Sequence, residues 1–128
     1  MIQKNTQLQV VDNSGAKLVS CINIGKGFNK KVATIGDIVL VSIKVLRNKR
    51  RATSKVRKGE ICKALIIRTK TINKKNFFGD ILKFQENSVV LLSKQQKFLF
   101  TRIFGGVPFI FRYSKFTRII SLSSGILK

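Results

Sequence analysis

The chain contains 128 residues, among them 26 Lys and Arg, five Asp and Glu and no His, so its net charge at pH 7 is +21. A chain of this length with 44% hydrophobic residues can bury the core of one domain, which argues against a disordered basic tail. The lack of His excludes the usual catalytic triads and every His-ligated metal site, and five carboxylates are too few for most acid–base or magnesium sites. We therefore expect no enzymatic activity, no metal and no cofactor. The net charge predicts a polyanionic partner, because without one the many positive side chains repel one another in the folded state.

The two cysteines, Cys21 and Cys62, are too few for a four-thiolate zinc site and too far apart for a redox C-x-x-C motif. A disulfide between them stays open, but small apolar residues within strands are the favoured interpretation. The longest uncharged apolar stretch, Ile103–Phe111, has nine residues, whereas a membrane-spanning helix needs about 20. The first residues, Met1–Thr6, show neither an apolar signal-peptide core nor an Arg- and Ser-rich presequence. We expect no membrane partner.

Alternation of apolar and polar residues indicates strands through most of the chain. The clearest case is Ile38–Leu46, where Val39, Val41, Ile43 and Val45 form one apolar face. Many short strands at close spacing predict a mainly β protein, built as a small closed barrel in a single domain that covers residues 1–128. The predicted strands are Thr6–Val11, Ala16–Ile24, Ile38–Leu46, Ile61–Lys70, Ile81–Phe84 and Ser88–Ser93.

Turn-forming residues separate these strands. The tetrapeptide Asp12-Asn13-Ser14-Gly15 predicts a turn, because Asp and Asn side chains bond their own backbone and Gly accepts a positive φ. Near the C-terminus, short helices or irregular segments are expected at Gly105–Tyr113 and Ser121–Leu127. Three Gly–acid pairs stand directly before apolar runs and predict turns leading into strands, not catalytic carboxylates: Gly36-Asp37, Gly59-Glu60 and Gly79-Asp80.

The segment Arg47–Lys58 is the strongest functional feature, because seven of its twelve residues are cationic. It connects two of the clearest strands, so we expect it to form the tip of a projecting basic β-hairpin. Cations at this density repel one another, project outward and become ordered on phosphate. The alternative is a solvated loop that serves only solubility; nucleic-acid contact is favoured.

Two further basic clusters lie beside Gly or Phe residues. One surrounds Gly25 and Gly27, where a flexible loop can approach a nucleic-acid backbone closely. The other precedes Phe77 and Phe78, whose rings either receive unstacked bases or pack in the core. The candidate RNA-binding residues of the whole chain are Lys17, Lys26, Lys30, Lys31, Lys44, Arg47, Lys49, Arg50, Arg51, Lys55, Arg57, Lys58, Arg68, Lys70, Lys74 and Lys75.

Several segments, in this order, resemble one family, the universal large-subunit ribosomal proteins numbered fourteen. Each motif is weak alone, but their order and spacing over essentially the whole chain are specific. The matching stretches are Asp12–Lys17, Gly36–Ile38, Lys58–Glu60 leading into Lys63-Ala64 and Arg68–Lys70, Val89–Leu92, Thr101–Gly105 and Ile119–Leu122.

The resemblance implies a five-stranded β-barrel with a projecting β-ribbon and short C-terminal helical segments. It implies a structural constituent of the large ribosomal subunit that binds large-subunit rRNA at the inter-subunit face and bridges to small-subunit rRNA. Neighbouring large-subunit proteins are implied partners, as is a ribosome-silencing factor in bacteria and organelles. By match to the family's motifs, the residues at the inter-subunit face are Thr101, Arg102, Arg118 and Ser121.

The chain departs from the family pattern in its last quarter. Gly106–Arg112 lacks the usual acid and most of the polar residues, so its apolar surface needs a partner. If this run is a helix, Pro108 belongs in its first turn. Ser123-Ser124-Gly125 replaces an Ala-Pro-Glu step, which removes the start of the last helix.

Composition also bears on location. Lys, Ile, Phe and Asn, which A/T-rich codons encode, are abundant, whereas the chain has one Pro. Together with the divergence, this predicts a ribosome in the mitochondrial matrix, with a plastid or the bacterial cytoplasm as alternatives. The alternative function is a free-standing barrel that binds single-stranded nucleic acid without sequence preference.

Overall fold

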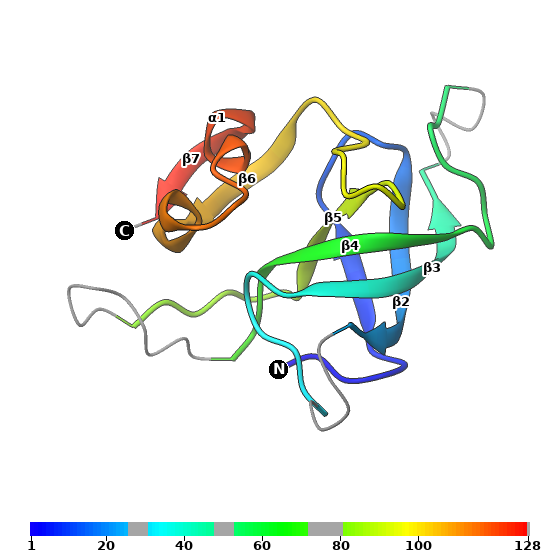
Figure 1. Ribbon diagram of the computed structural model, residues 1–128, viewed down its shortest axis with the longest axis horizontal. Coiled ribbons are helices and arrows are strands. Elements are labelled where there is room, and N and C mark those ends of the chain that lie inside the picture. The colour runs from blue at the N-terminus through cyan, green and yellow to red at the C-terminus, as the bar shows by residue number, and fades with distance from the viewer. Residues whose placement is uncertain (26–30, 48–52, 72–80, 128) are drawn as a thin grey trace.

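The computed structural model describes residues 1–25, 31–47, 53–71 and 81–127. Five strands form a closed barrel in the order β1-β2-β3-β4-β5, which confirms the mainly β fold and the predicted barrel (Figure 1). Consecutive strands pair antiparallel, and the parallel pairing of β1 with β5 closes the barrel. The strands are β1 (Gln7–Val10), β2 (Ala16–Ile24), β3 (Ile38–Leu46), β4 (Ile61–Arg68) and β5 (Ser88–Leu92).

Along each strand, side chains alternate between the two faces, and those that point inward fill the barrel interior. On β3, the apolar face predicted from the sequence is buried at Val39, Val41 and Ile43. Val45 on the same face is 41% exposed, and it lies beyond Ser42, the last residue of β3 in register with β4. Both cysteines are buried, unpaired and within strands, which confirms their interpretation as small apolar residues.

A second hydrophobic core lies on the outside of the barrel, under residues 103–127, which we call the C-terminal lobe (Figure 1). The lobe consists of β6 (Ile103–Pro108), the 3-10 helix η2 (Phe109–Tyr113), the helix α1 (Arg118–Leu122) and β7 (Ser123–Leu127). Because the lobe covers them, β4 and β5 are buried on both faces over most of their length. The outer face of these strands and the lobe contribute Leu65, Ile67, Val90, Leu92, Ile103, Val107, Phe111 and Ile119 to the second core.

The lobe corrects part of the expected secondary structure. Gly105 and Gly106 lie in β6, and Pro108 ends that strand and caps the 3-10 helix η2, so only Phe109–Tyr113 of the expected segment is helical. Ser123–Leu127 is also a strand, paired in parallel with β6, and only residues 118–122 of the lobe are α-helical. A Cβ added at Gly106 would lie 3.1 Å from Cγ of Leu127, so the missing side chain leaves room for this packing. In the described part of the chain, no helix is long and apolar enough to cross a membrane.

The segment Ile81–Phe84 is not the strand that the sequence predicts. It makes only an isolated bridge at Leu82, and Ile81 is 68% exposed. Its nearest backbone bond runs from the Phe84 N–H to the Thr69 carbonyl, at 3.4 Å, beyond the end of β4. Within the described residues, no strand pairs with this segment.

Two of the predicted Gly–acid turns are confirmed by the same geometry. Both Gly36 and Gly59 have a positive φ, of 88° and 83°. In each turn the acid's carboxylate accepts a backbone N–H three residues earlier, Asp37 from Thr34 at 3.0 Å and Glu60 from Arg57 at 2.9 Å. The carboxylates thus serve as turn acceptors. The third pair, Gly79-Asp80, lies outside the described residues.

Candidate nucleic-acid interface

The turn after β1 is organised by a buried carboxylate. Asp12 has no solvent exposure, and its Oδ1 accepts from the backbone N–H of Ser14, at 2.9 Å, and from the Ser14 hydroxyl. Its Oδ2 accepts from the backbone N–H of Leu91 in β5, at 2.7 Å. Burial raises the pKa of Asp12, and these bonds together with the charge of Arg47 counteract only part of that rise. The carboxylate therefore fixes the turn to the barrel wall.

The next residue of the turn holds the segment that enters the lobe. The Asn13 Nδ2 donates to the Thr101 hydroxyl at 2.6 Å, and its Oδ1 accepts from the backbone N–H groups of Thr101, at 2.9 Å, and Arg102, at 3.3 Å. The Phe104 N–H donates to the Val11 carbonyl at 2.8 Å. Two residues predicted for the inter-subunit face are thus positioned by a side chain 88 positions earlier in the chain.

Two guanidinium groups meet at one aromatic ring. Arg102 lies 4.8 Å and Arg47 5.1 Å from the centroid of the Phe104 ring, both within cation–π range. Arg47 is also held by its Nη2, which donates to the Val10 carbonyl at 3.0 Å. Arg102 is exposed and Arg47 is half-buried. Arg47, the first residue of the predicted basic hairpin, therefore lies next to Arg102 of the predicted inter-subunit face.

A groove at the edge of the lobe collects most of the predicted inter-subunit residues. Thr101, Arg102 and Ser121 all line it, and its volume is about 650 Å³. Arg118 does not line this groove; it lies exposed at the start of α1, and its carbonyl accepts from the Ser121 hydroxyl at 2.8 Å. The groove combines the exposed guanidinium of Arg102, hydroxyl groups and the partly buried ring of Phe104. These are groups that contact phosphate, sugar and base edges.

Arg68 has a different role from the RNA contact predicted for it. Its side chain lies between the barrel and the lobe, where Nε donates to the Gly106 carbonyl at 2.8 Å and Nη2 donates to the Phe104 carbonyl. Its Nη1 pairs with Glu86 at 3.1 Å. Burial lowers the pKa of Arg68, and the carboxylate of Glu86 counteracts this. Because Arg68 is only 8% exposed and each of its three guanidinium nitrogens has a partner, we remove Arg68 from the interface.

The described parts of the predicted basic hairpin, which contain no strand between β3 and β4, are anchored on the same turn. The Arg47 N–H donates to the Gly15 carbonyl at 2.9 Å, and the Lys55 N–H donates to the Ser14 carbonyl at 3.0 Å. Val56 is buried, at 1% exposure, whereas the neighbouring Lys55, Arg57 and Lys58 side chains are exposed. The chain therefore leaves and rejoins the barrel at one place with its cations outward.

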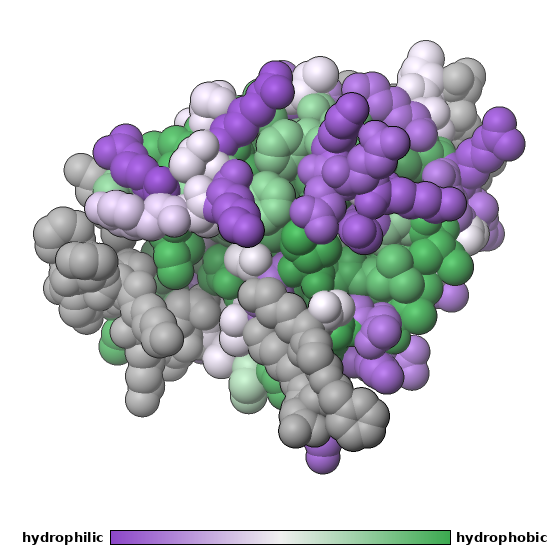
Figure 2. All heavy atoms as spheres, viewed as in Figure 1, coloured by the Kyte–Doolittle hydropathy of each residue, from purple (hydrophilic) through white to green (hydrophobic). Residues whose placement is uncertain are grey.

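The remaining candidate cations divide into two sets. Lys17, Lys31, Lys44 and Lys70 are exposed on the described surface. Figure 2 shows hydrophilic side chains standing over apolar surface on one face of the molecule. The candidates outside the described residues are Lys26, Lys30, Lys49, Arg50, Arg51, Lys74 and Lys75, together with the neighbouring Phe77 and Phe78.

Sequence reasoning missed the contribution of Asn13 and Phe104. The turn motif containing Asn13 was interpreted only as a turn, and Phe104 only as an apolar neighbour of Arg102. Both belong to motifs that carry the family resemblance, but no local periodicity relates residues so distant in sequence. Within the described ranges, no three potential metal ligands come together, and the carboxylates described above serve as backbone acceptors.

Comparison with known proteins agrees with this arrangement. A family model described as ribosomal protein L14p/L23e matches residues 1–127. The chain is also 44% identical over 127 residues to the large ribosomal subunit protein uL14 of the bacterium Carsonella ruddii (strain PV), covering 99% of this chain and 100% of that protein. A match over the full fold, including both the barrel and the lobe, identifies this chain as a member of the ribosomal protein L14p/L23e family.

Proposed function

We propose that this chain is a structural constituent of the large ribosomal subunit that binds large-subunit rRNA through its exposed cations. The observation that carries the proposal is the joined surface of Arg47, Arg102 and Phe104, which Asn13 fixes to the barrel. Family membership supports it, as does the net charge of +21. The family is one of ribosomal proteins, and we propose no catalytic activity.

Sedimentation through a sucrose gradient after a high-salt wash tests this proposal. The chain is expected to stay with the large subunit at salt concentrations that strip loosely bound basic proteins. Recovery at the top of the gradient would contradict it and favour the alternative, a free-standing barrel that binds single strands without sequence preference. RNA cleavage by the purified chain would contradict the non-enzymatic assignment.

The proposed mechanism of RNA binding is neutralisation of phosphates with release of counterions. With about 6–10 phosphate contacts, affinity for isolated rRNA falls roughly 10³–10⁵-fold between 50 and 200 mM salt. Replacing the exposed Arg57 and Lys58 by Ala is expected to reduce the slope of log affinity against log salt by about 1 per lost contact. Lys4→Gln, at an exposed lysine outside the candidate set, is the control and leaves the slope unchanged. An unchanged slope in the double variant would remove the hairpin base from the interface.

We further propose that the groove at Thr101, Arg102 and Ser121, with Arg118 nearby, faces the small subunit and contributes a bridge to its rRNA. Neighbouring large-subunit proteins and a ribosome-silencing factor are proposed partners of the chain, the latter on this same face. Arg102→Ala is expected to raise the Mg²⁺ concentration at which half of the subunits associate, as measured by light scattering. An unchanged midpoint would place the bridge elsewhere.

The location of this ribosome is also a proposal. The A/T-type composition led to the expectation of a mitochondrial matrix, but the similar protein described above belongs to a bacterium. That similarity supports the bacterial cytoplasm over the organelle. Sequencing the DNA on either side of the gene distinguishes a bacterial from an organellar genome and leaves the ribosomal role untouched.

A further inference from the structure

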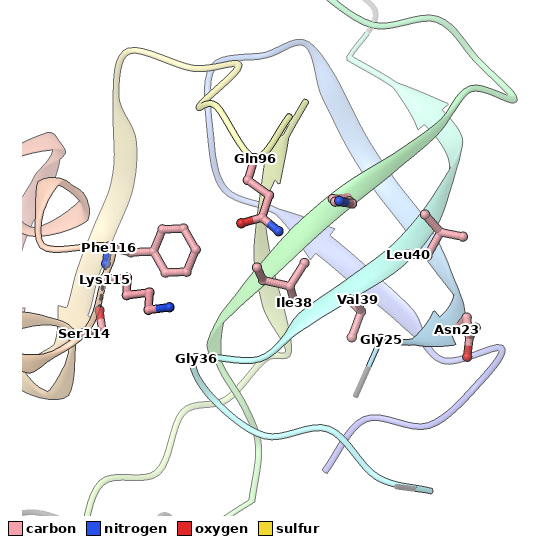
Figure 3. A pocket seen from close by; sticks show the side chains of 11 residues that line it. Asn23, Gly25, Gly36, Ile38, Val39, Leu40, Gln96, Ser114, Lys115 and Phe116 are labelled. Atoms are coloured by element: carbon pink, nitrogen blue, oxygen red, sulfur yellow. Dashed lines mark hydrogen bonds between the residues drawn. The ribbon is translucent and has the colours of Figure 1, made fainter. Parts of the chain in front are cut away.

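A cavity of about 640 Å³ lies between the barrel wall and the lobe, away from the groove described above. One side is formed by β3 and β4, with Ile38, Leu40 and Lys63 among the lining residues. Lys115 and Phe116 line the other side, in the segment between η2 and α1. Figure 3 shows Phe116 and Lys115 extending from the lobe towards the barrel.

The cavity exists because the second core ends there. Ile38 pairs in register with Leu65, which is buried under the lobe, and two residues further along β3, Leu40 pairs with Lys63. Ile38 and Leu40 are therefore left half-buried at the margin of the covered surface. The apolar side chains of Ile38 and Leu40 therefore line the opening. The cation of Lys63 takes the place along β4 where a further core residue would otherwise lie.

The aromatic ring in the cavity is held in place from behind. Phe116 contacts the Phe98 ring edge-on, with 6.2 Å between centroids. Its backbone N–H donates to the Ser114 hydroxyl at 3.1 Å, and that hydroxyl in turn donates to the Phe111 carbonyl at 3.0 Å. The ring is only half-buried, so it is pre-ordered and still accessible from the cavity. A ring fixed in this way stacks on a planar ligand at little cost in conformational entropy.

The polar groups of the cavity favour a ligand that joins an anionic group to a planar ring with hydrogen-bonding atoms. Lys63 and Lys115 supply two cations, and no carboxylate lines the cavity or pairs with either lysine among the residues that the structure describes. The amides of Asn23 and Gln96 also line it. The Asn23 Oδ1 accepts from the Ile24 N–H at 2.8 Å, which leaves its Nδ2 as a donor, and Gln96 points inward in Figure 3. Amide side chains can donate to and accept from a base edge, which carries both kinds of group.

We propose that this cavity receives one unstacked nucleotide of the rRNA. The base lies against Phe116 and the apolar wall at Ile38, the Gln96 and Asn23 amides bond its edge, and Lys63 and Lys115 hold the adjoining phosphates. Single-stranded RNA is commonly recognised by splayed bases stacked on aromatic rings beside cations. An apolar side chain of a neighbouring protein would fit the walls but leave both ammonium groups without a partner. The inference rests on the proposed function, because it names the RNA element that occupies one further site.

Ultraviolet cross-linking tests the proposal in large subunits that carry the full chain. Irradiation at 254 nm followed by trypsin and mass spectrometry is expected to yield a nucleotide adduct on the peptide that contains Phe116. Dimethyl sulfate probing of the same rRNA is expected to show a protected, unpaired base that becomes reactive in the Phe116→Leu variant. That variant retains an apolar side chain against Phe98 while removing the aromatic face.

The lysines are tested by the double variant Lys63→Gln with Lys115→Gln, which is expected to expose the same base. The matched control, Lys4→Gln, is expected to leave it protected. The cavity proposal would be overturned if adducts formed elsewhere on the chain but not at Phe116 and neither variant exposed a base. In that case rRNA binding still stands. A protein cross-link at Phe116 would assign the cavity to a neighbouring protein. Loss of the unmodified chain from the subunit in the gradient would instead overturn the proposed function itself.

Discussion

The barrel and the C-terminal lobe are stabilised in different ways. The barrel closes through continuous backbone pairing around an interior of alternating apolar side chains. The lobe has only two paired strands and one short helix, and is joined to the barrel by the second core, by Asn13 and by Arg68. We therefore expect the regular barrel to tolerate small losses better than the lobe, which depends on a few specific polar contacts. The lobe residues that we propose to face RNA depend on the same contacts.

The largest effect is expected from Arg68→Met, which keeps an unbranched apolar stem but removes the guanidinium. The Phe104 and Gly106 carbonyls lose their donor, at a cost of about 1–3 kcal/mol of unfolding free energy for each unsatisfied group, and the 35% exposed Glu86 carboxylate loses its partner. Denaturant unfolding measures the total loss, and hydrogen exchange should locate it in the lobe. Lys70→Met, at an exposed neighbour, serves as control. Equal exchange in lobe and barrel would contradict a local clamp.

Two glycine substitutions separate backbone strain from crowding at this clamp. Gly36→Ala is expected to cost about 1 kcal/mol, because its φ is positive but no atom lies within 4 Å of the new Cβ. Gly105 has a similar φ of 81°, and a Cβ there would lie 2.5 Å from Nη2 of Arg68. Gly105→Ala therefore adds about 1–3 kcal/mol of overpacking. Equal thermal unfolding midpoints for the two variants would show that the guanidinium moves aside freely.

A smaller effect is expected at the joint between turn and lobe. Asn13→Ala removes three hydrogen bonds from the Thr101–Arg102 segment, at a cost of about 1–2 kcal/mol of unfolding free energy. Asn13→Asp keeps the acceptor for both backbone N–H groups and should recover part of that loss. Chemical denaturation of the three proteins measures this. Identical stability of the Asp and Ala variants would mean that the backbone bonds do not hold the segment.

The smallest effect concerns a thiol within the barrel. Burial raises the pKa of Cys62 to about 11, with further contributions from Glu60 and Asp12, and the residue is 4% exposed. Since only the thiolate reacts, alkylation by iodoacetamide at pH 8 should be slow in the folded chain and fast in denaturant. Mass spectrometry of the labelled chain measures both rates. Rapid labelling of Cys62 under native conditions would reveal that β4 opens locally, contrary to its role in the barrel wall.

Local pattern was sufficient for the barrel. β2 and β3 have the bounds that alternation predicts, and the turn signals at Asp12–Gly15 and Gly36-Asp37 mark true turns. These features are encoded within a few residues, since alternation selects the buried face and Gly supplies the positive φ. The resemblance grouped Thr101, Arg102, Arg118 and Ser121, and the structure brings all of these except Arg118 to one groove.

The lobe and the fate of individual cations required the tertiary structure. Arg47 and Arg68 both looked like RNA ligands in the sequence, yet one lies half-buried against the partly buried Phe104 ring and the other is buried against two carbonyls. Among the described residues no strand pairs with Ile81–Phe84 despite its strand propensity, whereas Ser123–Leu127 becomes a strand because it pairs with β6. By itself the sequence determined the barrel and the overall basic charge, because both follow from local alternation and composition. Which cations remain free for RNA was decided only by contacts between residues distant in the chain, because burial and carbonyl partners arise when the lobe packs on the barrel.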